Sequence, residues 1–239
     1  MDYLPDFKTR QDEHDWILHQ FESVKWTPDN RSNVPNRTEH RSALLGIGGR
    51  VLPVWSIASR SNQLLYKVLR RMVIRDFPEH KWSSLFCNVN FKGGWHRDTH
   101  NSGPSVLLVF ERGMKGGGLL VRRDGGEERL NARFMDGGAK FDGNDEHKAE
   151  DFELEQGGVR VSVVVYEHDN YAMYRDMGHT RVLNYMPGDL APPAALETEV
   201  GMQKYINTLP FGSMERKRAE YMLVYSRNGL ESGLSLSSD

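Results

Sequence analysis

The chain has 239 residues, of which 38% are hydrophobic and 27% are charged, and its formal net charge is −2. This length suits one domain with a real core, and the composition is that of a soluble globular protein. Every apolar run is shorter than the roughly 20 residues that span a bilayer, and residues 1–16 are too polar and acidic for a signal peptide. Cys87 is the only cysteine, which excludes an internal disulfide or a cysteine-rich zinc site and agrees with an intracellular location.

Two segments near the N-terminus are predicted to be helices, residues 9–23 and residues 61–76. In the second segment, apolar residues recur at helical spacing with basic residues between them, and Ser61 can cap the start. We therefore expect amphipathic helices ahead of the middle of the chain.

The segment between Glu39 and Asp76 contains no acidic residue, although it contains seven lysines and arginines. This pattern is typical of a solvated helix face, and it also fits a surface that faces nucleic-acid phosphates. Both interpretations are open at this point. The arginines that would contact a DNA backbone in the second interpretation are Arg50, Arg60, Arg70 and Arg71.

The middle of the chain changes to short, β-branched segments that are separated by glycine-rich turns. These predicted strands are residues 83–91, 105–111, 117–123 and 159–168. Short strands that come after helices favour an α+β fold, with a β-sandwich or jelly-roll core and helices packed on one face.

The chain is expected to form one domain in three parts. Residues 1–82 are a helical, basic support region, and residues 83–185 are the β-rich core. Residues 186–239 then supply a loop, a helix at 213–225 that Ser213 can cap, and a flexible serine-rich tail.

The stretch GGWHRDTHN, at residues 93–101, carries a candidate metal site. On an extended strand, His96 and Asp98 point the same way and can meet one ion. Two histidines and one carboxylate on one face of an octahedron suit Fe(II) and leave three positions open. His100 is expected not to bind the metal, because the chain must turn before it.

His147 is the best candidate for the second histidine because of its position ahead of a polar strand. The segment GGVRVSVVVYE, a glycine turn followed by this strand, begins ten residues later and carries Arg160. An arginine placed there can bind the distal carboxylate of 2-oxoglutarate with two hydrogen bonds. A lone His-x-Asp pair also occurs as an ordinary surface hydrogen bond, so the prediction depends on the order of all the residues involved.

The strand at 160–168 alternates polar and apolar side chains, so Arg160, Ser162, Tyr166 and His168 share one face. Burying such a face is costly unless its polar groups meet ligands. In the alternative interpretation, Tyr166 packs in the core and His168 merely ends the strand.

Two motifs resemble the catalytic core of the TET/JBP dioxygenases, which oxidise 5-methylated pyrimidines in DNA with Fe(II) and 2-oxoglutarate. They are HRDTHN at 96–101 and RVSVVVYEH at 160–168. Animal TET enzymes share the forms His-Arg-Asp-x-His-Asn and Arg-x-Ser-x-x-x-Tyr-x-His. The resemblance covers about residues 85–170, and it implies a double-stranded β-helix of the jelly-roll type. The cysteine-rich zinc region of animal TET proteins is absent, so the chain is similar to a compact relative.

The resemblance also implies roles for individual residues. The metal ligands are His96, Asp98 and His147. The residues that hold 2-oxoglutarate are Arg160 and Ser162, to which we add the neighbouring strand residues Asn88 and Asn90. The residues that hold a flipped base are Asn101, Tyr166 and His168.

The implied activity is oxidation of 5-methylcytosine in DNA to 5-hydroxymethylcytosine, with Fe(II), 2-oxoglutarate and dioxygen. The extent of further oxidation is left open. We expect a monomer that acts on DNA and not at a membrane, located in a eukaryotic nucleus or otherwise in a cytoplasm. The alternatives are a related oxygenase acting on thymine, N6-methyladenine, methylated RNA or a protein side chain, and a non-catalytic nucleic-acid-binding module.

Overall fold

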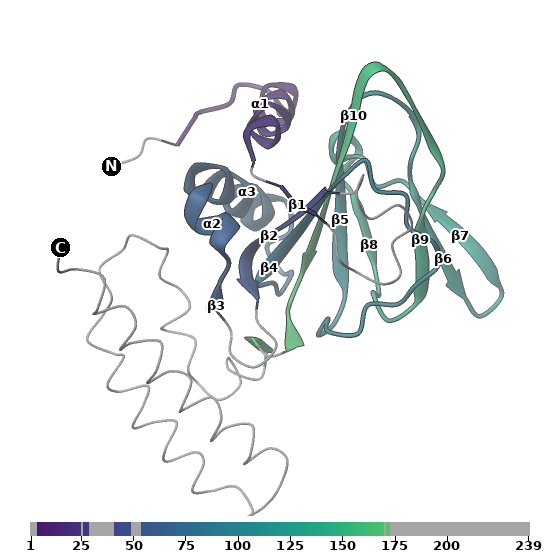
Figure 1. Ribbon diagram of the computed structural model, residues 1–239. Coiled ribbons are helices and arrows are strands. Elements are labelled where there is room, and N and C mark those ends of the chain that lie inside the picture. The colour runs from purple at the N-terminus through teal and green to yellow at the C-terminus, as the bar shows by residue number, and fades with distance from the viewer. Residues whose placement is uncertain (1–3, 25, 29–40, 49–53, 170, 173–239) are drawn as a thin grey trace, which may run out of the picture. The chain divides into compact units, whose positions relative to one another are not determined.

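The computed structural model describes residues 4–24, 26–28, 41–48, 54–169 and 171–172 (Figure 1). The chain divides into two compact units, and the first consists of residues Met1–Ile47 and Trp55–Asp169. The second consists of Gly48–Val54 and Asn170–Asp239. The predicted C-terminal region, including the helix at 213–225, lies outside the described residues.

Helices lie mainly in the N-terminal part of the described chain, and strands dominate after residue 83. The helices are α1 (Arg10–Ser23), α2 (Ile57–Ser61), α3 (Gln63–Asp76) and the 3-10 helix η1 (Phe134–Asp136). The strands are β1 (Thr27–Pro28), β2 (Arg41–Gly48), β3 (Val54–Trp55), β4 (Ser84–Val89), β5 (Ser105–Gly116), β6 (Leu119–Arg123), β7 (Gly126–Leu130), β8 (Ala139–Phe141), β9 (Glu146–Ala149) and β10 (Phe152–Tyr166).

The first predicted helix is confirmed as α1. Thr9 caps it with a capping box, in which the Thr9 side chain and the Asp12 side chain each accept the other residue's backbone N–H. The N-terminal boundary predicted from sequence is therefore accurate to one residue.

The second predicted helix is present, but Ser61 does not cap it. Ser61 is the last residue of the short helix α2, whose own cap is Ser56. Asn62, at φ −127° and ψ 48°, is not helical and separates α2 from α3. Its side-chain amide donates to the carbonyl of Ala58 at 2.8 Å. This hydrogen bond caps the C-terminal end of α2, and the side chain makes no capping hydrogen bond at the start of α3. An asparagine that bonds locally to backbone in this way competes with continuous helix.

The strands form two antiparallel sheets. The main sheet has the order β1-β2-β4-β10-β5-β8, and the small sheet has the order β7-β6-β9. The predicted strands are confirmed as β4, β5, β6 and β10, although β5 and β10 are longer than expected. Sequence patterns did not indicate β2, in which residues 41–46 pair along the whole of β4.

Strand β10 is the centre of the main sheet, between β4 and β5. Ser162 is opposite Asn88 of β4 on one side and Val109 of β5 on the other. A register shift interrupts the β5 pairing between Leu154 and Val159. The long central strand therefore fixes the positions of the polar residues from Arg160 onwards against both neighbours.

The main sheet has one face toward the helices and one toward the small sheet (Figure 1). Toward the helices, Phe110 of β5 packs on Phe21 and His14 of α1, with ring centroids 6.4 and 5.8 Å away. Toward the small sheet, a core cluster joins main-sheet residues such as Leu107 to Leu119 of β6. The expected α+β fold, a jelly-roll core with helices on one face, is confirmed, and its two sheets do not close into a barrel.

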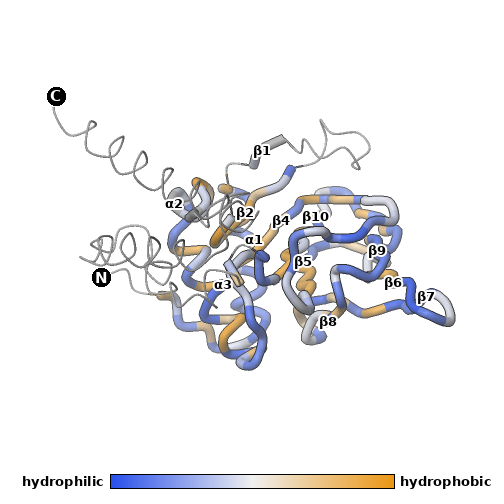
Figure 2. Tube along the Cα trace, turned by 90° about the horizontal axis from the view of Figure 1, so that it is seen from below, coloured by the Kyte–Doolittle hydropathy of each residue, from blue (hydrophilic) through white to orange (hydrophobic). Residues whose placement is uncertain are grey.

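Hydropathy agrees with this layering. Figure 2 shows hydrophobic stretches on β4 and β5 in the interior and a hydrophilic β7 at the edge. The exposed pattern of β7, whose residues are charged or glycine except at its end, agrees with an outer strand. Among the described residues, no helix has the length and apolar character needed to cross a membrane.

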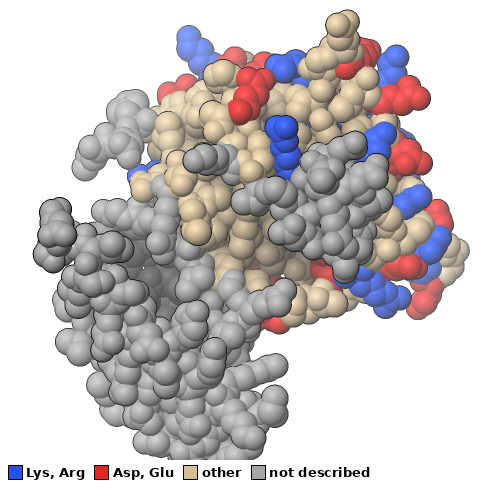
Figure 3. Space-filling view, in the orientation of Figure 1, with Lys and Arg blue, Asp and Glu red and all other residues tan. Residues whose placement is uncertain are grey.

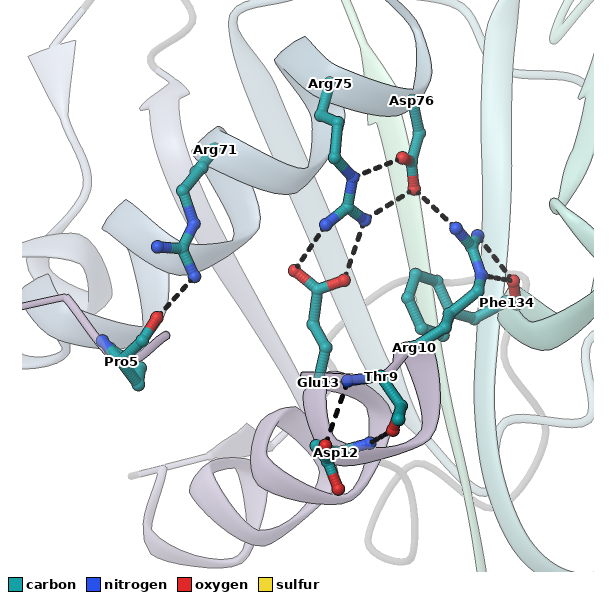
Figure 4. A network of polar contacts seen from close by, with 9 residues as sticks. All are labelled: Pro5, Thr9, Arg10, Asp12, Glu13, Arg71, Arg75, Asp76 and Phe134. Atoms are coloured by element: carbon teal, nitrogen blue, oxygen red, sulfur yellow. Dashed lines mark hydrogen bonds and ion pairs between the residues drawn. The ribbon is translucent and has the colours of Figure 1, made fainter. Parts of the chain in front are cut away.

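Helices α1 and α3 are held together by a partly buried ionic network (Figure 4). Glu13 is 1% exposed and accepts from both terminal nitrogens of Arg75, at 3.2 and 2.7 Å. Asp76 accepts from Arg75 and from Arg10, and Arg10 also donates to the carbonyl of Phe134. Removing one partner of such a pair leaves a buried charge uncompensated, so part of the basic segment serves the fold.

Candidate metal centre and cosubstrate cavity

A cavity of about 380 Å³ lies on the face of the main sheet that points away from the helices. The main sheet contributes Asn88, Arg160 and Ser162 to its lining, and the small sheet contributes Leu119 and His147. Polar groups from β4 and β10 therefore converge with a metal-binding type of residue from β9 in a single cavity that is open to solvent on one side.

His96, Asp98 and His147 come together in this cavity. One potential ligand atom from each lies within 4.8 Å of the other two. His147 Nε2 is 3.9 Å from Asp98 Oδ2, and the two imidazole rings have centroids 4.4 Å apart. Two histidines and one carboxylate at this spacing can bind one divalent ion on a single face and leave its other positions open.

The backbone holds these residues against each other. The N–H of His96 donates to the carbonyl of His147 at 3.0 Å, and the N–H of His147 donates back at 2.9 Å. The N–H of Asp98 donates to the carbonyl of Gly143 at 2.8 Å. Residues 96–98 therefore run extended alongside residues 143–147. In an extended segment, residues two apart point the same way, which is what the sequence prediction for His96 and Asp98 needs.

Each histidine is turned by a carbonyl two residues earlier in the chain. His96 Nδ1 lies 2.9 Å from the oxygen of Gly94, and His147 Nδ1 lies 2.8 Å from the oxygen of Asp145. A carbonyl only accepts hydrogen bonds, so both Nδ1 atoms carry the proton and both Nε2 atoms keep a free lone pair for a metal. Burial lowers the pKa of His147, against the opposing effects of the Asp145 carbonyl and Asp98, which favours the neutral form that binds metal.

Arg160 is a buried cation, only 1% exposed. Its Nη2 atom lies 3.4 Å from the carbonyl of Gly117, whereas Nε and Nη1 are buried with no hydrogen-bond partner in the described part of the chain. Burial lowers the pKa of the guanidinium to about 10. A buried charge is costly without a partner, so this side chain fits a site for an anionic ligand that is held by two hydrogen bonds.

Asn88 and Ser162 lie opposite each other on β4 and β10 and both line the cavity. Asn90 does not line it. Its side-chain oxygen accepts the backbone N–H of Arg160 at 2.9 Å, and its own N–H donates to the carbonyl of Arg160 at 2.8 Å. The structure therefore places Asn90 at the backbone of Arg160 and, of these three residues, brings only Asn88 and Ser162 to the cavity.

The residues expected to hold a base also line the cavity. Asn101 and His168 form an isolated antiparallel bridge, although they lie far apart in the sequence. Tyr166 lies beside His168 with ring centroids 6.4 Å apart, and burial raises the pKa of Tyr166 to about 12. The structure thus brings together Asn101, Tyr166 and His168 in the lining of one cavity.

Two residues that the sequence argument did not assign join this group. Asp169 bonds to Nδ1 of His168 at 2.8 Å and to Nδ1 of His100 at 3.3 Å. The His100 and His168 rings are parallel to within 1°, with centroids 6.0 Å apart. His100 lies outside the metal group, as expected. A period-two pattern cannot indicate this arrangement, because residues 99–100 form a bend.

Of the arginines proposed for a DNA backbone, Arg70 and Arg71 have described side chains, and neither lines the cavity. Arg70 and Arg71 are on α3, which covers the opposite face of the main sheet (Figure 1). Arg71 donates to the carbonyl of Pro5 at 2.7 Å. Arg50 and the side chain of Arg60 lie outside the described residues. An exposed arginine that does line the cavity is Arg97.

The small sheet carries many charges of both signs (Figure 3). Arg122 pairs with Glu127 and Glu146, at 3.0 and 3.2 Å, and Arg123 pairs with Glu128 at 2.7 Å. These cations are locally balanced, so the small sheet does not present a continuous positive surface.

No family model matches the chain, and no curated protein matches it. Similar solved structures include NgTET1 in complex with 5mC DNA, with 13% identity over 67% of this chain and 69% of that chain and a TM-score of 0.40. A Pseudomonas putida prolyl-4-hydroxylase has 15% identity over 68% of this chain and 88% of its own, with a TM-score of 0.37. OsALKBH1 has 10% identity over 67% and 94%, with a TM-score of 0.37. At scores this low, any assignment depends on the geometry of the chain's own residues.

Proposed function

We propose that the protein is an Fe(II)- and 2-oxoglutarate-dependent dioxygenase that oxidises 5-methylcytosine in DNA. The observation that carries this proposal is the buried guanidinium of Arg160, whose Nε and Nη1 have no hydrogen-bond partner in the described part of the chain, in the same cavity as the cluster of His96, Asp98 and His147. A metal site alone fits many activities. A metal site that shares its cavity with a buried cation, two of whose nitrogens have no hydrogen-bond partner among the described residues, fits a ligand that chelates the metal at one end and carries a carboxylate at the other.

The residues divide this task between them. His96, Asp98 and His147 would hold Fe(II) through two Nε2 atoms and a carboxylate. Arg160 would bind the distal carboxylate of 2-oxoglutarate, and Ser162, with Asn88, would fix the rest of that molecule. Fe(II) held there would supply dioxygen activation, in which 2-oxoglutarate, dioxygen and a methyl group give succinate, carbon dioxide and a hydroxymethyl group.

A base inside a duplex cannot reach such a cavity, so the target must be flipped out or single-stranded. Tyr166 supplies an aromatic ring for stacking in the cavity that Asn101 and His168 also line. Base–aromatic stacking is worth about 1–3 kcal/mol. The resemblance of residues 96–101 and 160–168 to the TET/JBP motifs supports DNA as the substrate. The chain is proposed to act as a monomer.

The polarity of Asn101 favours cytosine over thymine. Its amide nitrogen bonds to Asp98 and Ser105, at 2.9 and 3.0 Å, which leaves the carbonyl oxygen for a ligand. A carbonyl oxygen accepts from the exocyclic amine of cytosine, whereas thymine has a carbonyl at the same position. N6-Methyladenine also carries an N–H donor and is therefore the second candidate.

The test is nucleoside mass spectrometry after the protein is incubated with Fe(II), 2-oxoglutarate and methylated DNA. The proposal expects 5-hydroxymethylcytosine that depends on both additions, with succinate formed in parallel. Succinate without any oxidised nucleoside would keep the oxygenase chemistry and reject DNA as substrate. Methylated DNA bound but unchanged under these conditions would favour a non-catalytic nucleic-acid-binding module.

A further inference from the structure

Asn101 lies between the carboxylate of Asp98 and the hydroxyl of Ser105. Its Nδ2 atom is 2.9 Å from Asp98 Oδ2 and 3.0 Å from Ser105 Oγ. Ser105 is fully buried at the first residue of β5, so the second bond is anchored in the main sheet. These two contacts use both amide hydrogens of Asn101.

The orientation of this amide is set by the chemistry of its partner. An ionised carboxylate only accepts hydrogen bonds, so the edge of Asn101 that faces Asp98 must be its NH2 group. Reversing the amide would place a carbonyl oxygen against a carboxylate oxygen and remove a hydrogen bond to a charged group, which is among the stronger kinds. Asp98 therefore fixes the amide of Asn101, and the amide in turn fixes one oxygen of Asp98.

Gly143 encloses the same pair from the loop that precedes β9. Its carbonyl accepts the backbone N–H of Asp98 at 2.8 Å. A β-carbon at position 143 would lie 2.8 Å from Nδ2 of Asn101 and 3.0 Å from Oδ2 of Asp98. Any side chain at this position would therefore push against the contact between the amide and the carboxylate.

We propose that Asn101 is a positioning residue for the metal centre, which holds the Asp98 carboxylate in the orientation needed to share an ion with His96 and His147. This role rests on the metal site of the proposed function. The TET/JBP resemblance relates Asn101 only to the base, whereas the geometry gives its NH2 group to a metal ligand. Hydrogen-bond partners of ligating groups commonly set metal affinity.

The first test is titration of the metal-free Asn101→Leu protein with Mn(II), since leucine has a similar size but no donor. We expect the Mn(II) affinity to fall about tenfold to a hundredfold, as for other partners of metal ligands. The visible spectrum of the Co(II)-loaded variant should also differ from that of the unaltered protein, because the carboxylate is no longer held. Unchanged Mn(II) affinity and an unchanged Co(II) spectrum in a folded Asn101→Leu protein would overturn the proposal.

Asn131 offers a matched control. Its amide also donates to a carboxylate, Asp136 Oδ2 at 2.9 Å, but the pair is exposed and neither residue lines the cavity. Asn131→Leu should keep the Mn(II) affinity and the Co(II) spectrum. An equal loss in Asn131→Leu would show that the effect of Asn101→Leu is general destabilisation, which also overturns the proposal.

Gly143→Ala is a second variant, for the case in which Asn101→Leu does not fold. It leaves Asn101 chemically intact but forces the amide and the carboxylate apart, so a positioning role predicts weaker Mn(II) binding. If Asn101 only reads the base, Gly143→Ala should bind Mn(II) as the unaltered protein does, and that result would count against the proposal.

These measurements use Mn(II) or Co(II) alone and need neither 2-oxoglutarate turnover nor DNA. An unaltered protein that binds Mn(II) but forms no succinate would reject the proposed function, while the loss of affinity in Asn101→Leu would still support the positioning role. An unaltered protein that binds no Mn(II) would overturn both.

Discussion

His96 and His147 exchange both of their backbone hydrogen bonds, at 3.0 and 2.9 Å, so the two imidazole ligands are fixed to each other through the main chain. The carbonyls of Gly94 and Asp145 then turn each ring to present Nε2. Asp98 is the one member of the cluster whose side-chain position depends on other side chains. The site is therefore preformed at its histidines, and its carboxylate is the component most sensitive to its neighbours.

Replacing Asp98 should abolish both metal binding and turnover. Asp98→Ala removes the only carboxylate of the cluster and leaves two neutral ligands. We expect the loss of Mn(II) affinity to exceed the about tenfold to hundredfold change that results from the loss of an outer hydrogen-bond partner. Conversion of 2-oxoglutarate to succinate should stop. Normal succinate formation by Asp98→Ala would show that the metal ligands are misassigned.

His100→Ala is the control for this experiment. His100 is close in sequence, but its side chain is 66% exposed and it pairs with Asp169. Its removal should leave Mn(II) affinity intact. A loss as large as that of Asp98→Ala would make His100 a ligand and require a different arrangement of the loop that contains residues 96–101.

Replacing Arg160 should weaken 2-oxoglutarate binding without lowering the folding stability of the metal-free protein. Arg160→Met removes a buried charge that has no carboxylate partner in the described structure, so the metal-free protein should be as stable as the unaltered one or more stable. The affinity for 2-oxoglutarate should fall at least about thirtyfold, since losing a buried charged contact costs roughly 2–5 kcal/mol. Thermal melting and 2-oxoglutarate titration in the presence of Mn(II) measure the two effects.

Arg160→Lys tests whether the planar fork is needed as well as the charge. Lysine keeps a cation but cannot make the bidentate contact, so its 2-oxoglutarate affinity should lie between those of the unaltered protein and Arg160→Met. A protein with unchanged 2-oxoglutarate dependence in both variants would transfer the role to another basic residue.

Saturation with Mn(II) and 2-oxoglutarate should raise the melting temperature of the unaltered protein. At one hundred times the dissociation constant, a ligand that binds only the folded state adds about 2.7 kcal/mol, which in a chain of this size corresponds to about 5–11 °C. In Arg160→Met, the rise in melting temperature caused by 2-oxoglutarate should be mostly lost, while the rise caused by Mn(II) should remain. Equal shifts in the two proteins would place the cosubstrate away from Arg160.

The parts of the site that could be predicted from sequence are those set by local periodicity. His96 and Asp98 share a side because the chain is extended there, and Arg160 and Ser162 share a face because β10 is regular at that point. Asn90 shows the limit of this reasoning. Alternation with Asn88 would point it to the same face, but its φ of 51° leaves the extended region and turns the side chain to the backbone of Arg160.

Contacts that depend on a bend or on an irregular loop could not be predicted from the sequence pattern. The bond from Asn101 to Asp98 needs the bend at residues 99–100, and the approach of Gly143 needs the loop before β9. The basic segment had two open interpretations because composition does not show which way a helix faces. Arg71 and Arg75 bond within the protein, to Pro5 and Glu13 (Figure 4).

Stability should fall as the pH drops from about 7.5 to 5, the range in which histidine titrates. Burial lowers the pKa of His80, more than its bond to the Val165 carbonyl raises it. The pKa of His80 in the folded protein lies below the unfolded value of 6.5, so the unfolded chain binds a proton first as the pH falls. The stabilisation from neutral His80 is therefore fully present above pH 6.5 and is lost as the pH falls from there through the folded-state pKa. Burial lowers the pKa of His168 in the same way.

His80→Gln keeps a donor for Val165 but removes the titration, so its free energy of unfolding should depend less steeply on pH over this interval. Urea denaturation of the metal-free protein at several pH values measures the slope. His19→Gln, at an exposed side chain on α1, is the control. If His80→Gln and His19→Gln have the same slope as the unaltered protein, His80 does not contribute to the acid sensitivity.

The choice of base can be tested with equal amounts of DNA carrying 5-methylcytosine, thymine only, or N6-methyladenine. Because Asp98 holds the NH2 edge of Asn101, the carbonyl oxygen of the amide faces the base, and opposite the position of cytosine's exocyclic amine it requires an N–H donor, which thymine lacks there. We expect 5-methylcytosine to be oxidised first to 5-hydroxymethylcytosine and thymine to be the poorest substrate. Tyr166→Ala should weaken 5-methylcytosine oxidation by about 1–3 kcal/mol of lost stacking while leaving 2-oxoglutarate binding unchanged. Oxidation of thymine or N6-methyladenine with 5-methylcytosine untouched would reject the substrate but leave the iron chemistry in place.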